Sequence, residues 1–210
     1  MKKSAFRSLP EASLAGYQTL QTGNDCTMHA ISAAVKMLSG FEIDPHDLSK
    51  QVDKGWWDGR LFRLLPGSGV LPHMQRLILE WLIEEHHLPL QVKQLHLSPE
   101  VLRILPSDDT LAALVTIYWL GKAGPPIYHG TGNFNFNTTK GPSGHTMLMA
   151  AYDPGHVNVD GLETPWGFIN SWSDGGTDLF WMADDAFRKA WNFRFPWIGK
   201  NAAVVVSLKP

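Results

Sequence analysis

Only one cysteine, Cys26, occurs among the 210 residues of this chain. A lone cysteine excludes an intramolecular disulfide and any zinc site with several cysteine ligands. The formal net charge is −2, so the composition also lacks the basic excess that favours binding to nucleic acids and anionic membranes. We therefore expect neither a disulfide framework nor a nucleic-acid partner.

Long apolar runs are missing as well. Two lysines, Lys2 and Lys3, stand near the start, but no apolar run of seven or more residues follows them, which argues against a cleavable signal peptide. No window of the sequence approaches a transmembrane span. We expect no membrane insertion, and a location either in the cytoplasm or outside the cell after export by a route without a cleavable signal peptide.

The remaining composition is that of an ordinary globular protein, with 44% hydrophobic and 18% charged residues. A chain of this length forms one domain with a sizeable core, or two small lobes that share a cleft. Helical patterns dominate its first half and strand patterns its second half. We predict a single α+β domain over residues 1–210, with a helical N-terminal part packed on a C-terminal antiparallel sheet.

The expected elements follow from periodicity and from turn residues. Helices are predicted at 26–39, from 45 over a short stretch, from 72 to about 86, from 99 to about 105 and at 183–191. Strands are predicted at 90–95, 111–120, 145–152, 157–159, 168–172, 179–182 and 202–208. The stretch 121–144, rich in Gly, Pro and Asn, is predicted to be a long loop.

The single cysteine stands where a loop is expected to become a helix. Residues 23–25 favour turns and N-caps, and helical periodicity then runs from Cys26 to a stop at Gly40. In the first turn of a helix, unpaired N–H groups and the positive end of the dipole favour thiolate over thiol. Gln21 could direct its amide toward the sulfur as a donor to an oxyanion. Since a lone cysteine is usually a small buried hydrophobe, a nucleophile also requires a base elsewhere in the chain.

Nine histidines compete for the role of that base. His145 opens an apolar strand directly after a flexible Ser-Gly pair, so its side chain is expected to be held firmly at the mouth of the strand. His29 lies on the cysteine helix itself, and its spacing points it along the helix rather than across a cleft. We therefore predict His145 as the base.

An asparagine, Asn170, lies in a later strand pattern and is a candidate to orient this histidine. Its amide oxygen can accept from an imidazole N–H and so select the tautomer. Trp172, two residues further on, could shield that hydrogen bond from water. The alternative is that Asn170 is simply a turn residue that ends a strand.

Together these stretches resemble the papain-like cysteine peptidase superfamily. The shared order is a glutamine before a cysteine at a helix start, then Gly-His at the start of a strand, then Asn-Ser-Trp; here these are Gln21, Cys26, Gly144-His145 and Asn170-Ser171-Trp172. The match covers the first helix and residues 144–182. Residues 41–120 look more like the smaller C39-type bacterial peptidases than like the papain branch.

The resemblance implies a papain-like fold, with the nucleophile on the helical side and the histidine on the sheet. It implies Cys26 as nucleophile, His145 as base and Asn170 as orienting residue. Gln21 and the backbone N–H of Cys26 would then bind the oxyanion.

The sequence departs from the family pattern at two positions around the cysteine. Thr27 stands where glycine commonly follows the cysteine, and Leu20 stands six residues before the cysteine, where the glutamine is often found. The spacing shown by Gln21 occurs in some papain-fold hydrolases, such as Josephin-type deubiquitinases. Gln18 is the fallback for this role.

Two departures also concern the orienting residue. The residue after Asn-Ser-Trp is Ser173, where papain-type enzymes usually have glycine. C39-type enzymes usually orient the histidine with an aspartate, so Asp153 and Asp160 are rivals of Asn170.

The sequence therefore predicts a cysteine peptidase that hydrolyses peptide or isopeptide bonds of a peptide or protein substrate, without metal or organic cofactor. Papain-like folds also host deamidases, transglutaminases and acyltransferases, including secreted bacterial effectors, and these share the Cys–His chemistry. A binding module that keeps the fold without turnover is a further alternative, supported by Thr27 and by the residues after Trp172. Nothing in the sequence specifies the oligomeric state.

Overall fold

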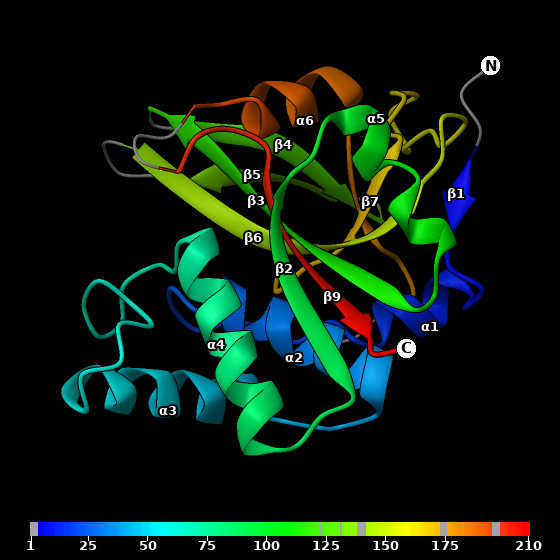
Figure 1. The fold of residues 1–210 in the computed structure, drawn as a ribbon. Coiled ribbons are helices and arrows are strands. Elements are labelled where there is room, and N and C mark those ends of the chain that lie inside the picture. The colour runs from blue at the N-terminus through cyan, green and yellow to red at the C-terminus, as the bar shows by residue number, and fades with distance from the viewer. Residues whose placement is uncertain (1–3, 122, 131, 138–141, 173–175, 195–197) are drawn as a thin grey trace.

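The fold is a twisted antiparallel sheet with helices packed on both of its faces (Figure 1). The computed structural model describes residues 4–121, 123–130, 132–137, 142–172, 176–194 and 198–210. The helices are α1 (Glu11–Ala15), α2 (Cys26–Ser39), α3 (Pro45–Trp57), α4 (Pro72–Glu85), α5 (Pro99–Leu102), a 3₁₀ helix (Leu105–Ser107) and α6 (Asp184–Trp191). The strands are β1 (Ala5–Phe6), β2 (Leu90–His96), β3 (Leu111–Leu120), β4 (Ala123–His129), β5 (Gly132–Asn137), β6 (Pro142–Tyr152), β7 (Trp166–Ile169), β8 (Phe180–Met182) and β9 (Ala202–Leu208).

Within the described residues, nine strands form one sheet, in which the order is β2-β9-β3-β6-β7-β8-β4-β5 and β1 pairs with β6. Every pairing is antiparallel. The predicted combination of helices with an antiparallel sheet is confirmed. The predicted division into two halves is only approximate, because β2 comes from the helical half and α6 from the strand-rich half.

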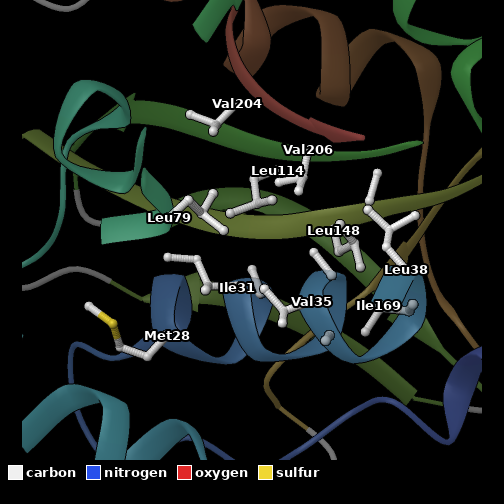
Figure 2. Packing of buried hydrophobic residues seen from close by; sticks show 14 of the residues in the cluster. Met28, Ile31, Val35, Leu38, Leu79, Leu114, Leu148, Ile169, Val204 and Val206 are labelled. Atoms are coloured by element: carbon white, nitrogen blue, oxygen red, sulfur yellow. The ribbon is translucent and has the colours of Figure 1, made fainter. Parts of the chain in front are cut away.

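Helix α2 lies against one face of the sheet and carries the first core cluster (Figure 2). Its apolar residues recur at helical spacing, and Ile31 and Val35 pack toward Leu114 and Leu148 on the strands. Removing one such side chain from water stabilises the fold by about 1.5–3 kcal/mol. The helix ends at Gly40, which adopts φ 73° and donates a hydrogen bond from its N–H to the carbonyl of Lys36.

Helix α6 covers the opposite face, where a second and more aromatic cluster forms. Trp166 from β7 stacks against Phe187 of α6, and Phe168 from the same strand meets that ring at a tilt. Because both faces of the sheet are covered, β3 is buried at every position from 112 to 119. This explains why its sequence is a continuous apolar run instead of an alternation.

The predicted loop at 121–144 is wrong, because its described residues include β4, β5 and the start of β6. β4 pairs on one side with β5 and on the other with β8. The prolines that suggested a loop lie where the register between β4 and β5 shifts, and at such an irregularity a missing N–H does not interrupt the ladder. Pairing with a strand far along the chain outweighs the local composition.

Smaller differences concern the ends of elements. The strand predicted at 157–159 is reduced to a single bridge between Val157 and Glu163. β7 ends at Ile169, so Asn170 begins the turn that follows the strand. Among the described residues, no helix has the length and apolarity needed to cross a membrane.

Candidate active site

Cys26 is the first residue of α2 and remains partly exposed. The carbonyl of Asp25 accepts from the N–H groups of Met28 and His29 and thereby closes the first helical turn. The N–H groups of Cys26 and Thr27 precede the first N–H that this turn uses. The sulfur is therefore placed at the electropositive end of the helix, as the sequence predicts.

His145 and Asn170 come from neighbouring strands and meet beside this helix start. The antiparallel pairing of Leu148 with Ile169 brings the residues after β7 level with the first half of β6. His145 Nε2 then lies 2.6 Å from Asn170 Oδ1. Because an amide oxygen can only accept, Nε2 must carry the proton in this hydrogen bond.

The asparagine is itself held in place. Its Oδ1 also accepts from the backbone N–H of Ser171 at 2.8 Å, which fixes the side toward which the oxygen points. The ring of Trp172 lies 5.1 Å from that of His145. His145 and Asn170 are 5% and 3% exposed, so their hydrogen bond is largely shielded from water. The tautomer of His145 is thereby determined. With Nε2 bonded to Asn170, Nδ1 is the ring nitrogen that can accept from the thiol.

Opposing effects act on the pKa of the Cys26 thiol. Burial raises this pKa, whereas the charge and hydrogen bond of His145 lower it, together with hydrogen bonds from the backbone N–H groups of Thr146 and Thr27. The net result is a pKa below the ordinary value of a cysteine. A lowered pKa means that more of the sulfur is present as the thiolate, which is the reactive form.

Contrary to expectation, the side-chain amide of Gln21 is not directed at the sulfur of Cys26. Its Nε2 donates to the carbonyl of Gly23 at 2.9 Å, and its Oε1 accepts from Ser171 Oγ. Its backbone N–H also donates to the carbonyl of Ser171, at 2.8 Å. The amide oxygen and the backbone N–H of Gln21 thus tie the segment before Cys26 to the residue after Asn170, while the amide nitrogen bonds within that segment.

Neither Gln18 nor Leu20 is better placed than Gln21 to donate a hydrogen bond to an oxyanion. Gln18 is buried, donates to the carbonyl of Asp178 at 3.1 Å and accepts from the backbone N–H of Asn170 at 3.4 Å. Leu20 is 52% exposed and has no polar group to offer. Both glutamines therefore act on the loops that carry the site, and a side-chain donor for an oxyanion would require one of them to rotate.

His29 is buried on the same helix as Cys26. Its Nδ1 pairs with Thr19 Oγ1 at 2.6 Å, and its ring meets that of His46 edge-on at 5.1 Å. Burial first, and then the neighbouring His46, lower the pKa of His29 to about 4. His29 is thus neutral near pH 7 and is turned toward Thr19, in line with its predicted minor role.

The rival carboxylates lie away from His145. Asp153 follows the last residue of β6, which places it about 26 Å along the strand direction from His145. There it accepts from Ser4 Oγ and from the N–H of Gly155. Asp160 is exposed in a turn closed by Asn158. Asn170 is the residue that the structure brings to the histidine.

A buried ion-pair network supports the segment before Cys26, and it has no signal in the sequence. The Arg63 guanidinium is fully buried and donates from Nη2 to Asp25 Oδ1 and from Nη1 to Asp53 Oδ1, each at 2.9 Å. The Asp25 carboxylate also accepts from Ser49 Oγ at 2.8 Å. Arg63 is one of 18 basic residues and lies in an aperiodic stretch, so spacing alone could not have singled it out.

Replacing Arg63 by methionine is expected to lower the free energy of unfolding by about 2–3 kcal/mol. Removal of one partner leaves buried charge uncompensated, which costs about 3–5 kcal/mol for a fully buried pair. Asp25 and Asp53 retain 16% and 31% exposure, which reduces that cost. Urea unfolding measures the loss. Arg76→Met is the matched control, since Arg76 pairs with Glu80 at the surface and should change stability by less than about 0.5 kcal/mol. Equal stability of the two variants would show that the Arg63 network does not support this segment.

The geometry of the site is thus a thiol at a helix start, an imidazole on the adjoining strand and an asparagine amide behind the imidazole. Comparison of the sequence with protein-family models and with characterised proteins gives no match.

Proposed function

We propose that this protein is a cysteine peptidase of papain-like fold, which hydrolyses peptide or isopeptide bonds through an acyl-enzyme intermediate. The observation that supports this most is the hydrogen-bonded series from Cys26 through His145 to Asn170 at the start of α2. A thiolate nucleophile needs a base within hydrogen-bond reach and a third group that orients the base. Cys26, His145 and Asn170 meet these three needs in turn.

In the proposed reaction, the Cys26 thiolate attacks the carbonyl carbon of the scissile bond. The carbonyl oxygen becomes an oxyanion and is stabilised by the backbone N–H of Cys26. His145, as an imidazolium, gives its Nδ1 proton to the leaving amine, and the C–N bond breaks. Water then attacks the thioester, His145 takes a proton from this water, and the acid product leaves as the thiolate is restored.

Asn170 would act throughout by holding the Nε2–H of His145. This bond keeps Nδ1 facing the sulfur in both halves of the reaction. Gln21 would add a second oxyanion donor only if its amide first released the carbonyl of Gly23.

Mass spectrometry of candidate peptides and proteins incubated with the full chain tests the proposal. A peptidase produces two fragments whose masses sum to the substrate plus one water. Deamidation instead adds about one dalton, and acyl transfer adds the mass of the acceptor less that of the amine or ammonia that leaves, since all three reactions pass through the same acyl-enzyme. Labelling of Cys26 by an E-64-type probe accompanies each of these activities. A folded protein whose Cys26 resists this probe would instead be a binding module.

Asn170→Ala is expected to lower kcat by about 10- to 1000-fold, because the residue orients the base without transferring a proton. Steady-state kinetics on the substrate found above provides the measurement. Asp160→Ala is the control and should stay within about twofold of wild type, as Asp160 is exposed in a turn with Asn158. A silent Asn170→Ala together with an inactive Asp153→Ala or Asp160→Ala would transfer the orienting role to a carboxylate.

A further inference from the structure

A buried cluster of polar side chains lies behind the proposed nucleophile and base. It joins α2, α4, β3 and β6 and consists of Thr27 (1% exposed), Gln75 (0%), Thr116 (4%) and Thr146 (2%). Thr27 directly follows Cys26, and Thr146 directly follows His145. The cluster therefore connects the two chain segments that carry the proposed reacting groups.

The hydrogen bonds within this cluster centre on Thr146. Thr27 Oγ1 donates to Thr146 Oγ1 at 3.2 Å, and the hydroxyls of Thr116 and Thr146 are 3.0 Å apart. Gln75 Nε2 donates to Thr116 Oγ1 and to Thr146 Oγ1, both at 2.9 Å. The same nitrogen also lies 3.4 Å from Thr27 Oγ1 and from the carbonyl oxygen of Val70, as longer contacts. α4 thus braces a contact that links α2 directly to β6.

Stability alone does not explain a glutamine at this position. Gln75 Oε1 is buried and has no hydrogen-bond partner within the described part of the chain. A buried acceptor without a partner destabilises the folded state, and an apolar side chain of similar volume, such as methionine, would avoid this penalty. The cluster is therefore a candidate for a role in the reaction.

The backbone N–H groups of the same two threonines also act on the pKa of the Cys26 thiol. Against the effect of burial, His145 and then the N–H groups of Thr146 and Thr27 act to lower the pKa of Cys26. The side-chain bond between Thr27 and Thr146 sets the separation of these two N–H donors. It also sets the separation of the residues that precede them, Cys26 and His145.

We propose that Thr27 and Thr146, braced by Gln75, are positioning residues that hold Cys26 and His145 at the separation required for proton transfer and keep two backbone donors on the sulfur. The inference rests on the proposed function of Cys26 as nucleophile. A shift of about 1 Å between reacting groups is enough to lower a rate by about 10²-fold.

Thr146→Val removes the central hydroxyl and keeps the branched shape, so it tests the proposal. The measurement is the rate of Cys26 alkylation by iodoacetamide as a function of pH in the folded full chain. Wild type should titrate below the ordinary thiol value of about 8.5. In Thr146→Val, the midpoint should rise by about one pH unit and alkylation near pH 6 should fall about 10-fold, since one unit is a factor of ten in thiolate. Thr146→Ser, which keeps the hydroxyl, should restore both values.

Kinetics with a cleaved substrate provide a second readout. Thr146→Val should lower kcat by about 10- to 100-fold and leave KM within about threefold, because the cluster acts on the reacting groups and not on substrate binding. Gln75→Met should shift both readouts in the same direction without a lower melting temperature. Thr164→Val is the matched control. Thr164 is also fully buried, and its hydroxyl pairs with His156 Nδ1 at 2.8 Å outside the cluster, so alkylation should keep its wild-type pH profile.

The outcomes separate this inference from the proposed function. If wild-type Cys26 titrates as an ordinary thiol and no substrate is turned over, the proposed function fails and the positioning role fails with it. If wild type is reactive but Thr146→Val and Gln75→Met keep its alkylation profile and its kcat, the positioning role is overturned and the proposed function stands. Should Thr146→Val fail to fold, Gln75→Met decides between the same two results.

Discussion

Replacing Cys26 by alanine is expected to reduce turnover to the uncatalysed background and to leave the fold intact. No other residue in the chain is a cysteine, so no second thiol can take over the attack on the substrate. The residue is only partly buried at a helix start, so the loss of its sulfur creates little cavity. Product formation by mass spectrometry and thermal unfolding measure the two effects. The melting temperature should fall by no more than about 3 °C, which corresponds to about 1 kcal/mol for a domain of this size.

Two further variants complete this experiment. Cys26→Ser should be inactive as well, because a hydroxyl is far less acidic than a thiol and the site is arranged for a thiolate. Ser32→Ala lies on the same helix and removes a buried hydroxyl that has no partner within the described residues. It should keep full activity and equal or higher stability. Turnover by Cys26→Ala at the wild-type rate would show that another residue is the nucleophile.

Replacing His145 by alanine is expected to lower kcat by about 10³-fold or more, since nucleophile and base act as one unit. Loss of this side chain also removes the charge and hydrogen bond that lower the pKa of Cys26, while the burial that raises this pKa remains. The pKa of the thiol should therefore rise. Less thiolate will then be present at any pH below the new value, so alkylation of Cys26 near pH 6 should become slower in this variant. Steady-state kinetics and iodoacetamide titration measure the two effects independently.

His29→Ala is the matched control for this experiment, since His29 is the histidine nearest to Cys26 along the chain. Its pKa of about 4 keeps it neutral near pH 7, and its Nδ1 is engaged by Thr19. A pKa this low makes the imidazole too weak a base to take the thiol proton effectively, so the loss in kcat should be less than about tenfold. A larger loss in His29→Ala than in His145→Ala would assign the base to α2.

Features that depend on a few neighbouring residues could be predicted from the sequence. The bounds of α2 follow from the turn-forming residues 23–25 before it and from Gly40 after it, and the structure has the same helix. The expectation that His145 lies on an apolar strand also follows from its neighbours, and the structure has it on β6. Caps and periodicity act within about one or two turns of chain, so the sequence alone contains the information they need.

Pairings between distant segments were the least predictable part of the fold. The Gly-, Pro- and Asn-rich composition gave no sign of the strands β4 and β5, and β8, the second partner of β4, lies much later in the chain. Which strands become neighbours depends on the burial of whole faces, and many pairings of short strands satisfy the local pattern equally well.

The sequence by itself therefore determines where the helix of Cys26 begins, and it narrows the partners of that cysteine to His145 with Asn170, Asp153 or Asp160 behind it. Only the tertiary structure decides that Asn170 Oδ1 meets His145 Nε2, that the amide of Gln21 is held by Gly23 and Ser171, and that Arg63 supports Asp25. Each of these contacts joins groups whose alternative partners differ little in local energy. Close packing of the two halves against each other selects among them, because a buried polar group must find its partner within the space that the packed core leaves.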